Sequence, residues 1–389
     1  MLYVACGSAI SGFIFDCDGT IYQPSGLIPG AEDVLTLLER RGANYVLLSN
    51  TGAKPHSAVY DKLAQGAFEC RPNGKPIPAG RIYTAADAQV DFMLSGHLPP
   101  GSKLLVLAPD GCWKTMMRER DQALFESWEV AETMDVPTAK EWSQLSRQWT
   151  ADCDGGDGGG EVDLESVGLQ PKVAVVFFHD GPVEGDWSYE LLHAMTILLN
   201  FGSDFIYTAD DNCIPSTDAA YPGTTFPMPG PGMFVDMLKK SMPPGTSTSR
   251  TYCCGKGGNI GRKFIIDRAI RMLEEQGHSG DRNQIMIVGD RFDTDVRAGV
   301  LAGIKSCLVV SGTHTLEMAD EFPTDIPSYT CKSIAKLQPR LQKLQELAVS
   351  QKLRALAREV SVKSIARRAR GGDCSMVSVP KDWLDGRSP

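Results

Sequence analysis

Two aspartates two residues apart carry the clearest chemical signal in this sequence. Asp16 and Asp18 follow the apolar run Phe13-Ile14-Phe15, which is typical of a short buried strand. In an extended chain, residues i and i+2 point to the same side, so both carboxylates would face one pocket. Such close carboxylates resist joint ionisation unless a cation lies between them or one stays protonated. The pair predicts a nucleophile beside a proton carrier, with a divalent metal to hold them, rather than a plain acidic turn.

Three further groups of polar residues stand where predicted strands end. The hydroxyl and amide of Ser49 and Asn50 are suited to an oxyanion or phosphate cradle, although Ser-Asn-Thr-Gly is also ordinary turn composition. Lys256 is flanked by glycines and can reach a bound anion as a point charge. Its segment lacks the Walker spacing and matches a nucleotide-binding glycine loop only loosely. The third group offers hard oxygen ligands that suit Mg²⁺, and it comprises Asp290, Asp293 and Asp295.

Alternating strands and helices would position these residues. Short apolar strands alternate with helical patterns over residues 12–48 and again over 251–310, beginning with a core strand at Thr251–Cys254. The alternation predicts a doubly wound, Rossmann-like α/β core, whose parallel sheet binds ligands beyond the carboxyl ends of its strands. A second α/β pattern over residues 85–231 predicts an inserted cap domain. We therefore expect a core of residues 1–84 and 232–338, followed by a tail of residues 339–389.

Composition excludes several classes of protein. The 389 residues carry a net charge of -9, which argues against general nucleic-acid binding. No continuous apolar run is long enough to cross a bilayer, and the first residues do not resemble a signal peptide. The 11 cysteines are scattered without a Cys-x-x-Cys pair, which suits reduced thiols. We expect a cytoplasmic protein without integral membrane contact.

Two segments have unusual charge. Residues 152–161 are acidic and glycine-rich, and we interpret them as a disordered surface loop because a calcium loop needs ligands at fixed spacing. From Cys331 to the end, 13 Lys and Arg stand against five Asp and Glu. The basic helix predicted over residues 341–370 is interpreted as solvated or packed on the core, with docking to a membrane surface or a partner as the alternative.

The four polar groups occur in the order of the four motifs of the haloacid dehalogenase superfamily. The resemblance covers about residues 12–315, and it rests on Asp16-x-Asp18-Gly-Thr, Ser49-Asn50, Lys256 and Gly289-Asp290-x4-Asp295. Residues 207–211, 229–232 and 289–295 look like the branch of 4-nitrophenylphosphatases and phosphoglycolate phosphatases. The chain departs from that branch at Gly257 and Ala209, where proline and asparagine are usual.

The resemblance implies a Mg²⁺-dependent phosphatase acting on small phosphomonoesters such as phosphoglycolate, glycerol phosphate, pyridoxal phosphate or 4-nitrophenyl phosphate. It implies that Asp16 attacks phosphorus to form an aspartyl-phosphate, while Asp18 gives and takes the proton. Mg²⁺ would be held by Asp16, the backbone carbonyl of Asp18, and Asp290. Asp295 and Asp293 would orient water or the lysine.

The remaining candidates concern the substrate. By the same resemblance, Ser49, Asn50 and Lys256 would bind the phosphate, and the cap would select the leaving group. Asp211, together with Asp210 and Asn212, either reaches the leaving group or forms a helix-capping turn. His179-Asp180 follows a predicted cap strand and is interpreted as structural.

The expected partner is a small phosphorylated metabolite, and the resembling branch adds a homodimer through the cap as an expectation. Two other functions remain open from sequence. One is a phosphotransferase that passes the phosphoryl group to an alcohol. The other is a non-catalytic binding protein on a phosphatase fold, although the intact set of charged residues argues against it.

Overall fold

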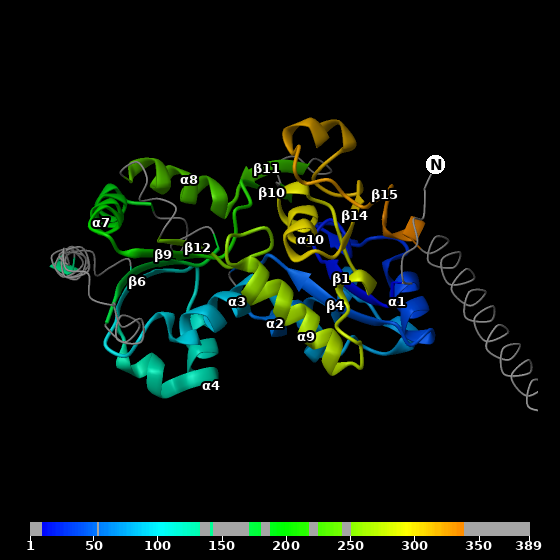
Figure 1. The fold of residues 1–389 in the computed structure, drawn as a ribbon, viewed down its shortest axis with the longest axis horizontal. Coiled ribbons are helices and arrows are strands. Elements are labelled where there is room, and N and C mark those ends of the chain that lie inside the picture. Colours follow the sequence, from blue (N-terminus) through cyan, green and yellow to red (C-terminus); the bar gives the residue numbers. More distant parts are fainter. Residues whose placement is uncertain are drawn as a thin grey trace, which may run out of the picture. The chain divides into compact units, whose positions relative to one another are not determined.

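Two parallel sheets form the framework of the protein (Figure 1). The computed structural model describes residues 10–52, 54–132, 141–142, 171–179, 187–217, 225–242 and 250–337. The larger sheet has six strands in the order β15-β14-β13-β1-β4-β5, and the second has five in the order β12-β9-β8-β6-β7. The prediction of a doubly wound α/β core with a second, inserted α/β pattern is confirmed.

The six-stranded sheet is parallel throughout. Its strands are β1 (Gly12–Asp16), β4 (Asn44–Ser49), β5 (Ile82–Thr84), β13 (Ile285–Gly289), β14 (Lys305–Val309) and β15 (Tyr329–Cys331). Gly12 at the start of β1 pairs with both Asn44 and Ile285, so the three central strands begin in register. Their carboxyl ends therefore meet at one edge of the sheet, which is where the predicted catalytic residues lie.

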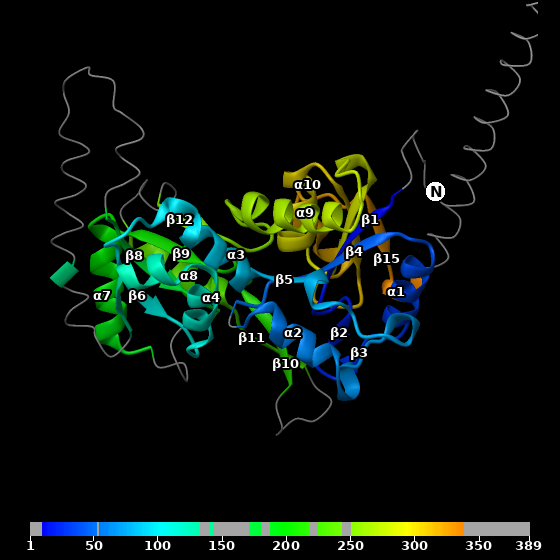
Figure 2. The ribbon, with the colours of Figure 1, turned by 90° about the horizontal axis from the view of Figure 1, so that it is seen from below.

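Helices cover both faces of this sheet, as expected for a sheet whose central strands are apolar on both sides. They are α1 (Ala31–Arg40), α2 (His56–Leu63), α3 (Ala85–Phe92), α9 (Asp267–Glu275) and α10 (Arg297–Ala302). Figure 2 shows α9 and α10 on one face and α1 on the other. Single π-helical segments precede α9 and α10, at Arg262–Ile266 and Phe292–Val296, and another follows α3 at Met93–His97. Short 3-10 helices lie at Gly66–Phe68, Pro72–Gly74, Ala79–Arg81, Arg282–Gln284, Leu316–Glu321 and Ile334–Lys336.

The five-stranded sheet also packs between helices (Figure 1). Its strands are β6 (Lys103–Leu107), β7 (Glu129–Ala131), β8 (Val173–Phe177), β9 (Asp204–Tyr207) and β12 (Thr251–Cys253), and its further helices are α4 (Cys112–Ser127), α7 (Tyr189–Asn200) and α8 (Pro231–Ser241). Alternate strand residues face opposite sides, because successive side chains of a strand point in opposite directions. Thus Leu105 and Val175 pack with α7 and α8, whereas Leu104 and Val176 pack with α3 and α4.

The structure corrects the predicted place of Thr251–Cys254. We expected a strand of the core sheet, but β12 is the edge strand of the five-stranded sheet and pairs in parallel with β9. Cys253 is buried in the same apolar cluster as Phe205 and Tyr207, and α8 joins that cluster through Val235. An apolar pattern predicts a buried strand but does not say which sheet it joins, and this is why the prediction was wrong. The boundaries proposed at residues 84 and 338 stay predictions.

Two antiparallel hairpins complete the described chain. β2 (Tyr22–Gln23) pairs with β3 (Gly26–Leu27), and β10 (Cys213–Thr217) pairs with β11 (Thr225–Pro229). The acidic segment 152–161, the basic segment 341–370 and Asp180 lie outside the described residues. Among the helices that are described, none has the length and apolar character needed to cross a membrane.

Candidate active site

Loops at the carboxyl ends of both sheets contribute to one polar cluster. Asp16 ends β1, Ser49 ends β4 and Asp290 follows β13, all in the six-stranded sheet. Lys256 follows β12 and Asp211 follows β9, both in the five-stranded sheet. The structure therefore brings together residues that the sequence predicted separately, each at the end of a strand.

Three buried carboxylates lie together, and two of them bind the amine of Lys256. Asp16, Asp290 and Asp295 each place one oxygen within 4.8 Å of the other two. Lys256 Nζ donates a hydrogen bond to Asp295 Oδ1 at 2.6 Å and another to Asp16 Oδ1. The lysine side chain is only 1% exposed, so its charge is satisfied almost entirely by these two acids. This contact fixes the nucleophile candidate Asp16 beside a permanent positive charge.

Glycine makes room for one of these carboxylates. A Cβ atom on Gly19 would lie 2.4 Å from Asp290 Oδ2, and Gly19 also has a φ of +80°, which side chains disfavour. A Cβ on Gly312 would lie 2.0 Å from the same oxygen. The N–H of Thr313 donates to this Asp290 oxygen at 2.5 Å. The glycine of the Asp-x-Asp-Gly motif is therefore required by the close approach of Asp290.

Burial controls the protonation of the cluster. Burial raises the pKa of Asp16 well above its ordinary value, because the attraction of Lys256 offsets burial and the repulsion of neighbouring acids only in part. Burial and the charge of Asp295 raise the pKa of Asp290 to about 7, against the lowering effect of the Thr313 hydrogen bond. Burial would lower the pKa of Lys256, but Asp16 and Asp295 raise it, so the amine keeps its charge. One ammonium cannot balance three carboxylates, so full ionisation would leave an excess of negative charge in a buried site.

This excess fits a divalent cation. Carboxylate oxygens are the ligands that Mg²⁺ prefers, and a bound cation would favour the ionised form of the acids whose pKa burial raises. Asp16 and Asp290 of the predicted ligand set are both in the cluster. Asp295 is also there, where it binds Lys256. A divalent metal at this position is therefore consistent with the donor chemistry of the described residues.

Asp18 lies at the solvent side of the cluster. Its side chain is 58% exposed, whereas Asp16 two residues earlier is 5% exposed as a whole residue. Tyr22 of the hairpin β2–β3 donates its hydroxyl hydrogen to Asp18 Oδ2 at 3.3 Å, and Lys62 Nζ lies 3.8 Å from Asp18 Oδ1. The two aspartates thus have different surroundings, one buried against Lys256 and one exposed to solvent.

Ser49 is the last residue of β4, and Asn50 begins the loop that follows this strand. Ser49 is buried, and its hydroxyl oxygen accepts the N–H of Thr51 at 3.1 Å. Asn50 Oδ1 accepts the N–H of Lys256 at 2.9 Å, and Asn50 Nδ2 donates to Asp211 Oδ2 at 2.9 Å. Both polar atoms of the Asn50 side chain therefore contact protein groups rather than lying free for a phosphate.

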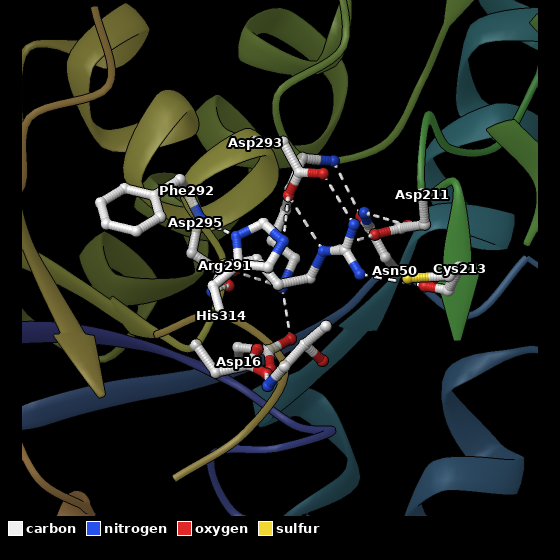
Figure 3. Close-up of polar contacts among 12 residues, drawn as sticks. Asp16, Asn50, Asp211, Cys213, Arg291, Phe292, Asp293, Asp295 and His314 are labelled. Carbon is white, nitrogen blue, oxygen red and sulfur yellow. Dashed lines mark hydrogen bonds and ion pairs between the residues drawn. The ribbon is translucent and has the colours of Figure 1, made fainter. Parts of the chain in front are cut away.

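A buried arginine organises the outer part of the site, as Figure 3 shows. Arg291 Nε lies 3.2 Å from Asp211 Oδ1, and the same guanidinium binds both oxygens of Asp293 at 3.0 and 2.7 Å. Arg291 Nη1 donates to the carbonyl of Cys213 at 3.0 Å. Asp293 thus contacts Arg291, and it is Asp295 that contacts Lys256. His179, interpreted from sequence as structural, donates its backbone N–H to Thr208 Oγ1 at 3.2 Å.

Comparison with known proteins agrees with this architecture. A family model described as haloacid dehalogenase-like hydrolase matches residues 13–120, and a second model of similar hydrolases matches residues 261–337. The two matches contain the loops of Asp16, Ser49 and Asp290. The chain is similar to the haloacid dehalogenase-like hydrolases in both segments. This confirms the family predicted from the four motifs.

Relatives of this hydrolase are named as phosphatases. The glycerol-3-phosphate phosphatase of Homo sapiens is 25% identical over 355 residues, which cover 86% of this chain and 91% of the relative. Chloroplastic phosphoglycolate phosphatase 1A of Arabidopsis thaliana is 24% identical, with 85% of this chain and 78% of the relative covered. The structure of 4-nitrophenylphosphatase from Thermotoga maritima aligns with a TM-score of 0.54 and 22% identity, over 84% of this chain and 96% of that one. This last likeness supports the fold.

Sequence reasoning missed several residues of the hydrolase site. Arg291 lies in the loop after β13 and binds the carbonyl of Cys213. Thr313 and His314 contact this loop, where the Nδ1 atom of His314 accepts the N–H of Phe292 at 2.9 Å. Arg291 had a detectable signal, because it is the one basic residue among the acids of the fourth motif. The other two had none, since they lie more than 20 residues farther along the chain and no motif marks them.

Proposed function

We propose that this protein is a Mg²⁺-dependent phosphatase that hydrolyses small phosphomonoesters through attack by Asp16. The observation that supports this proposal is the buried cluster of Asp16, Asp290 and Asp295, in which Lys256 binds Asp16 and Asp295. The substrates we propose are of the phosphoglycolate, glycerol phosphate, pyridoxal phosphate or 4-nitrophenyl phosphate type. The first two types correspond to the names of the human and plant relatives.

In the first step, a carboxylate oxygen of Asp16 attacks phosphorus and the bond from phosphorus to the leaving oxygen breaks. Asp18 is exposed, so it is accessible to the leaving group and can donate a proton to that oxygen. Alkoxides are poor leaving groups, and this proton is what their departure needs. Asp18 then takes a proton from the water that attacks the aspartyl-phosphate. Inorganic phosphate leaves and the carboxylate of Asp16 is restored.

Other residues would bind the phosphoryl group and the metal. Lys256 lies against Asp16 and is placed to attract the oxygens that are not transferred, where charge spreads in the transition state. Ser49 would donate its hydroxyl to the same oxygens. Asp16, Asp290 and the backbone carbonyl of Asp18 would hold Mg²⁺. When bound, the metal would offset the repulsion between the carboxylate nucleophile and the phosphate dianion.

We propose that the five-stranded sheet and its helices act as a cap that selects the leaving group. The expected homodimer through this cap and the expected cytoplasmic location stay predictions.

The test is phosphate release from a panel of small phosphomonoesters, with Mg²⁺ and with EDTA, alongside the Asp16→Asn variant. We expect release that requires Mg²⁺ and disappears in the variant, and the ranking of kcat/KM would identify the preferred substrate class. Release of equal rate from Asp16→Asn with native-like unfolding would contradict the mechanism. No release from any compound would favour a larger phosphorylated substrate or a binding function.

A further inference from the structure

Asp211 is bound by side chains from two other loops. It follows β9 in the five-stranded sheet, yet its Oδ2 accepts from Asn50 Nδ2 at 2.9 Å and its Oδ1 lies 3.2 Å from Arg291 Nε. The side chains of Asp211 and Arg291 are each only 10% exposed. Removing one member of such a buried charged pair leaves the other uncompensated, so the position of Asp211 is strongly constrained.

The orientation of the Asn50 amide is determined by its partners. Its oxygen accepts the backbone N–H of Lys256 at 2.9 Å, so its NH₂ group must point toward Asp211. Lys256 in turn places its amine against Asp16 and Asp295. A continuous series of contacts therefore joins Asp211 to the nucleophile through Asn50 and Lys256.

Arg291 makes the second connection. It immediately follows Asp290, and its backbone N–H donates to Asp295 Oδ2 at 3.2 Å. Its guanidinium binds Asp211 and the carbonyl of Cys213, two residues later in the same segment (Figure 3). One side chain thus holds the segment after β9 against the loop that carries the metal-site acids.

We propose that Asp211, Asn50 and Arg291 form a latch that ties the segment after β9 to the catalytic loops and sets the position of Lys256. The three are positioning residues, because they act through Lys256 and the loop of Asp290, and the inference rests on the proposed phosphatase function. It assigns Asp211 and Asn50 a role different from the substrate contact expected from sequence. The position of the segment after β9 is thereby coupled to the position of the Asp16 carboxylate.

Exchanging the two side chains tests the latch. In Asp211→Asn, the new amide must point its NH₂ group either toward the NH₂ group of Asn50, whose orientation Lys256 fixes, or toward the guanidinium of Arg291. In both orientations two hydrogen-bond donors face each other. In Asn50→Asp, two carboxylates face each other. The double variant restores a matched pattern, since the new carboxylate accepts from Lys256 and from the new amide, whose oxygen accepts from Arg291. We expect each single variant to lower kcat by about 10-fold to 100-fold, as for one buried charged hydrogen bond.

The double variant should have a kcat at least about tenfold higher than that of the worse single variant, and its Tm should recover as well. Recovery of Tm without kcat, or recovery of neither, would overturn the positioning role. Should a single variant fail to fold, Asn50→Ala keeps the Arg291–Asp211 pair and removes both hydrogen bonds of the Asn50 amide, to Asp211 and to Lys256. It should lose kcat to the same degree, and unchanged kcat would overturn the proposal.

A matched control lies at the opposite end of β13. Arg282 shares its guanidinium between Asp267 Oδ1 at 2.6 Å and the carbonyl of Ala302 at 2.8 Å, which is the same pattern far from the nucleophile. Asp267→Asn should leave kcat within about twofold of the wild type, as expected for a distant site. If the wild type releases no phosphate at all, the proposed function is wrong. The effect of the double exchange would then be measurable only as a change in Tm.

Discussion

Replacing Lys256 with methionine removes the amine that binds the buried carboxylates of Asp16 and Asp295. The side chain is 1% exposed, and methionine fills a similar volume without the charge. Breaking a buried ion pair by removing one partner costs about 3–5 kcal/mol. At about 2 °C per kcal/mol for a large domain, Tm measured in EDTA should fall by about 6–10 °C. Turnover should fall by about 10²–10³-fold, as for loss of one group that stabilises transition-state charge.

The cost should depend on pH and on metal. In the wild type burial raises the pKa of Asp16 and Lys256 lowers it, so in the folded variant this carboxyl keeps a proton up to a higher pH. Above the unfolded-state value near 3.9, the folded variant therefore gains stability from proton binding as pH falls, and gains more than the wild type does. The loss of Tm should therefore shrink as pH falls from 8 to 6, and Mg²⁺ should reduce it at pH 8.

Thermal unfolding of wild type, Lys256→Met and the exposed control Lys305→Met, each with Mg²⁺ and with EDTA, measures these effects. The control should unfold within about 1 °C of the wild type, as usual for a surface substitution. A Lys256→Met variant in EDTA with the Tm of the wild type at pH 8 would refute the electrostatic reasoning. So would a loss of Tm that grows as pH falls.

Three other predictions concern the same protein. Asp16→Asn should abolish phosphate release while keeping the circular dichroism spectrum and cooperative unfolding of the wild type. Chelation should stop turnover and lower Tm, and Mg²⁺ at about 100 times its Kd should restore about 2.7 kcal/mol, measured by urea unfolding. Asp87→Asn should cost about 3 kcal/mol, because this fully buried carboxylate binds His56, Thr84 and Arg120. Burial would raise the pKa of Asp87, but these partners lower it. The wild type should therefore lose this stabilisation as pH falls below about 4, and urea unfolding at pH 7 and at pH 3 would measure the loss.

Sequence alone predicted the part of the site that local pattern determines. Asp16 and Asp290 each follow a short apolar strand, and the structure places both at the carboxyl ends of neighbouring parallel strands. The glycine after Asp18 belongs to the same motif, and the structure shows that Gly19 makes room for Asp290. Such features are predictable because they need only a few consecutive residues.

The rest depends on contacts between distant parts of the chain. Nothing near Asn50 shows that its amide lies between Lys256 and Asp211, more than 150 residues away. The sheet to which Thr251–Cys253 belongs is decided by packing against Phe205 and Tyr207, which the apolar pattern of a three-residue strand does not encode. Arg291 was overlooked because two of its partners, Asp211 and Cys213, lie in a distant segment of the chain.

The position of β12 has a consequence for protein engineering. Lys256 is delivered by an edge strand of the five-stranded sheet, whereas Asp16 and Asp290 are delivered by the six-stranded sheet. A graft that exchanged residues 85–231 for the equivalent piece of another enzyme would therefore keep the native β12, which would then have to pair with the β9 of the other enzyme. The junction belongs after Gly261 instead, so that the strand, the lysine and their sheet are transplanted as one module.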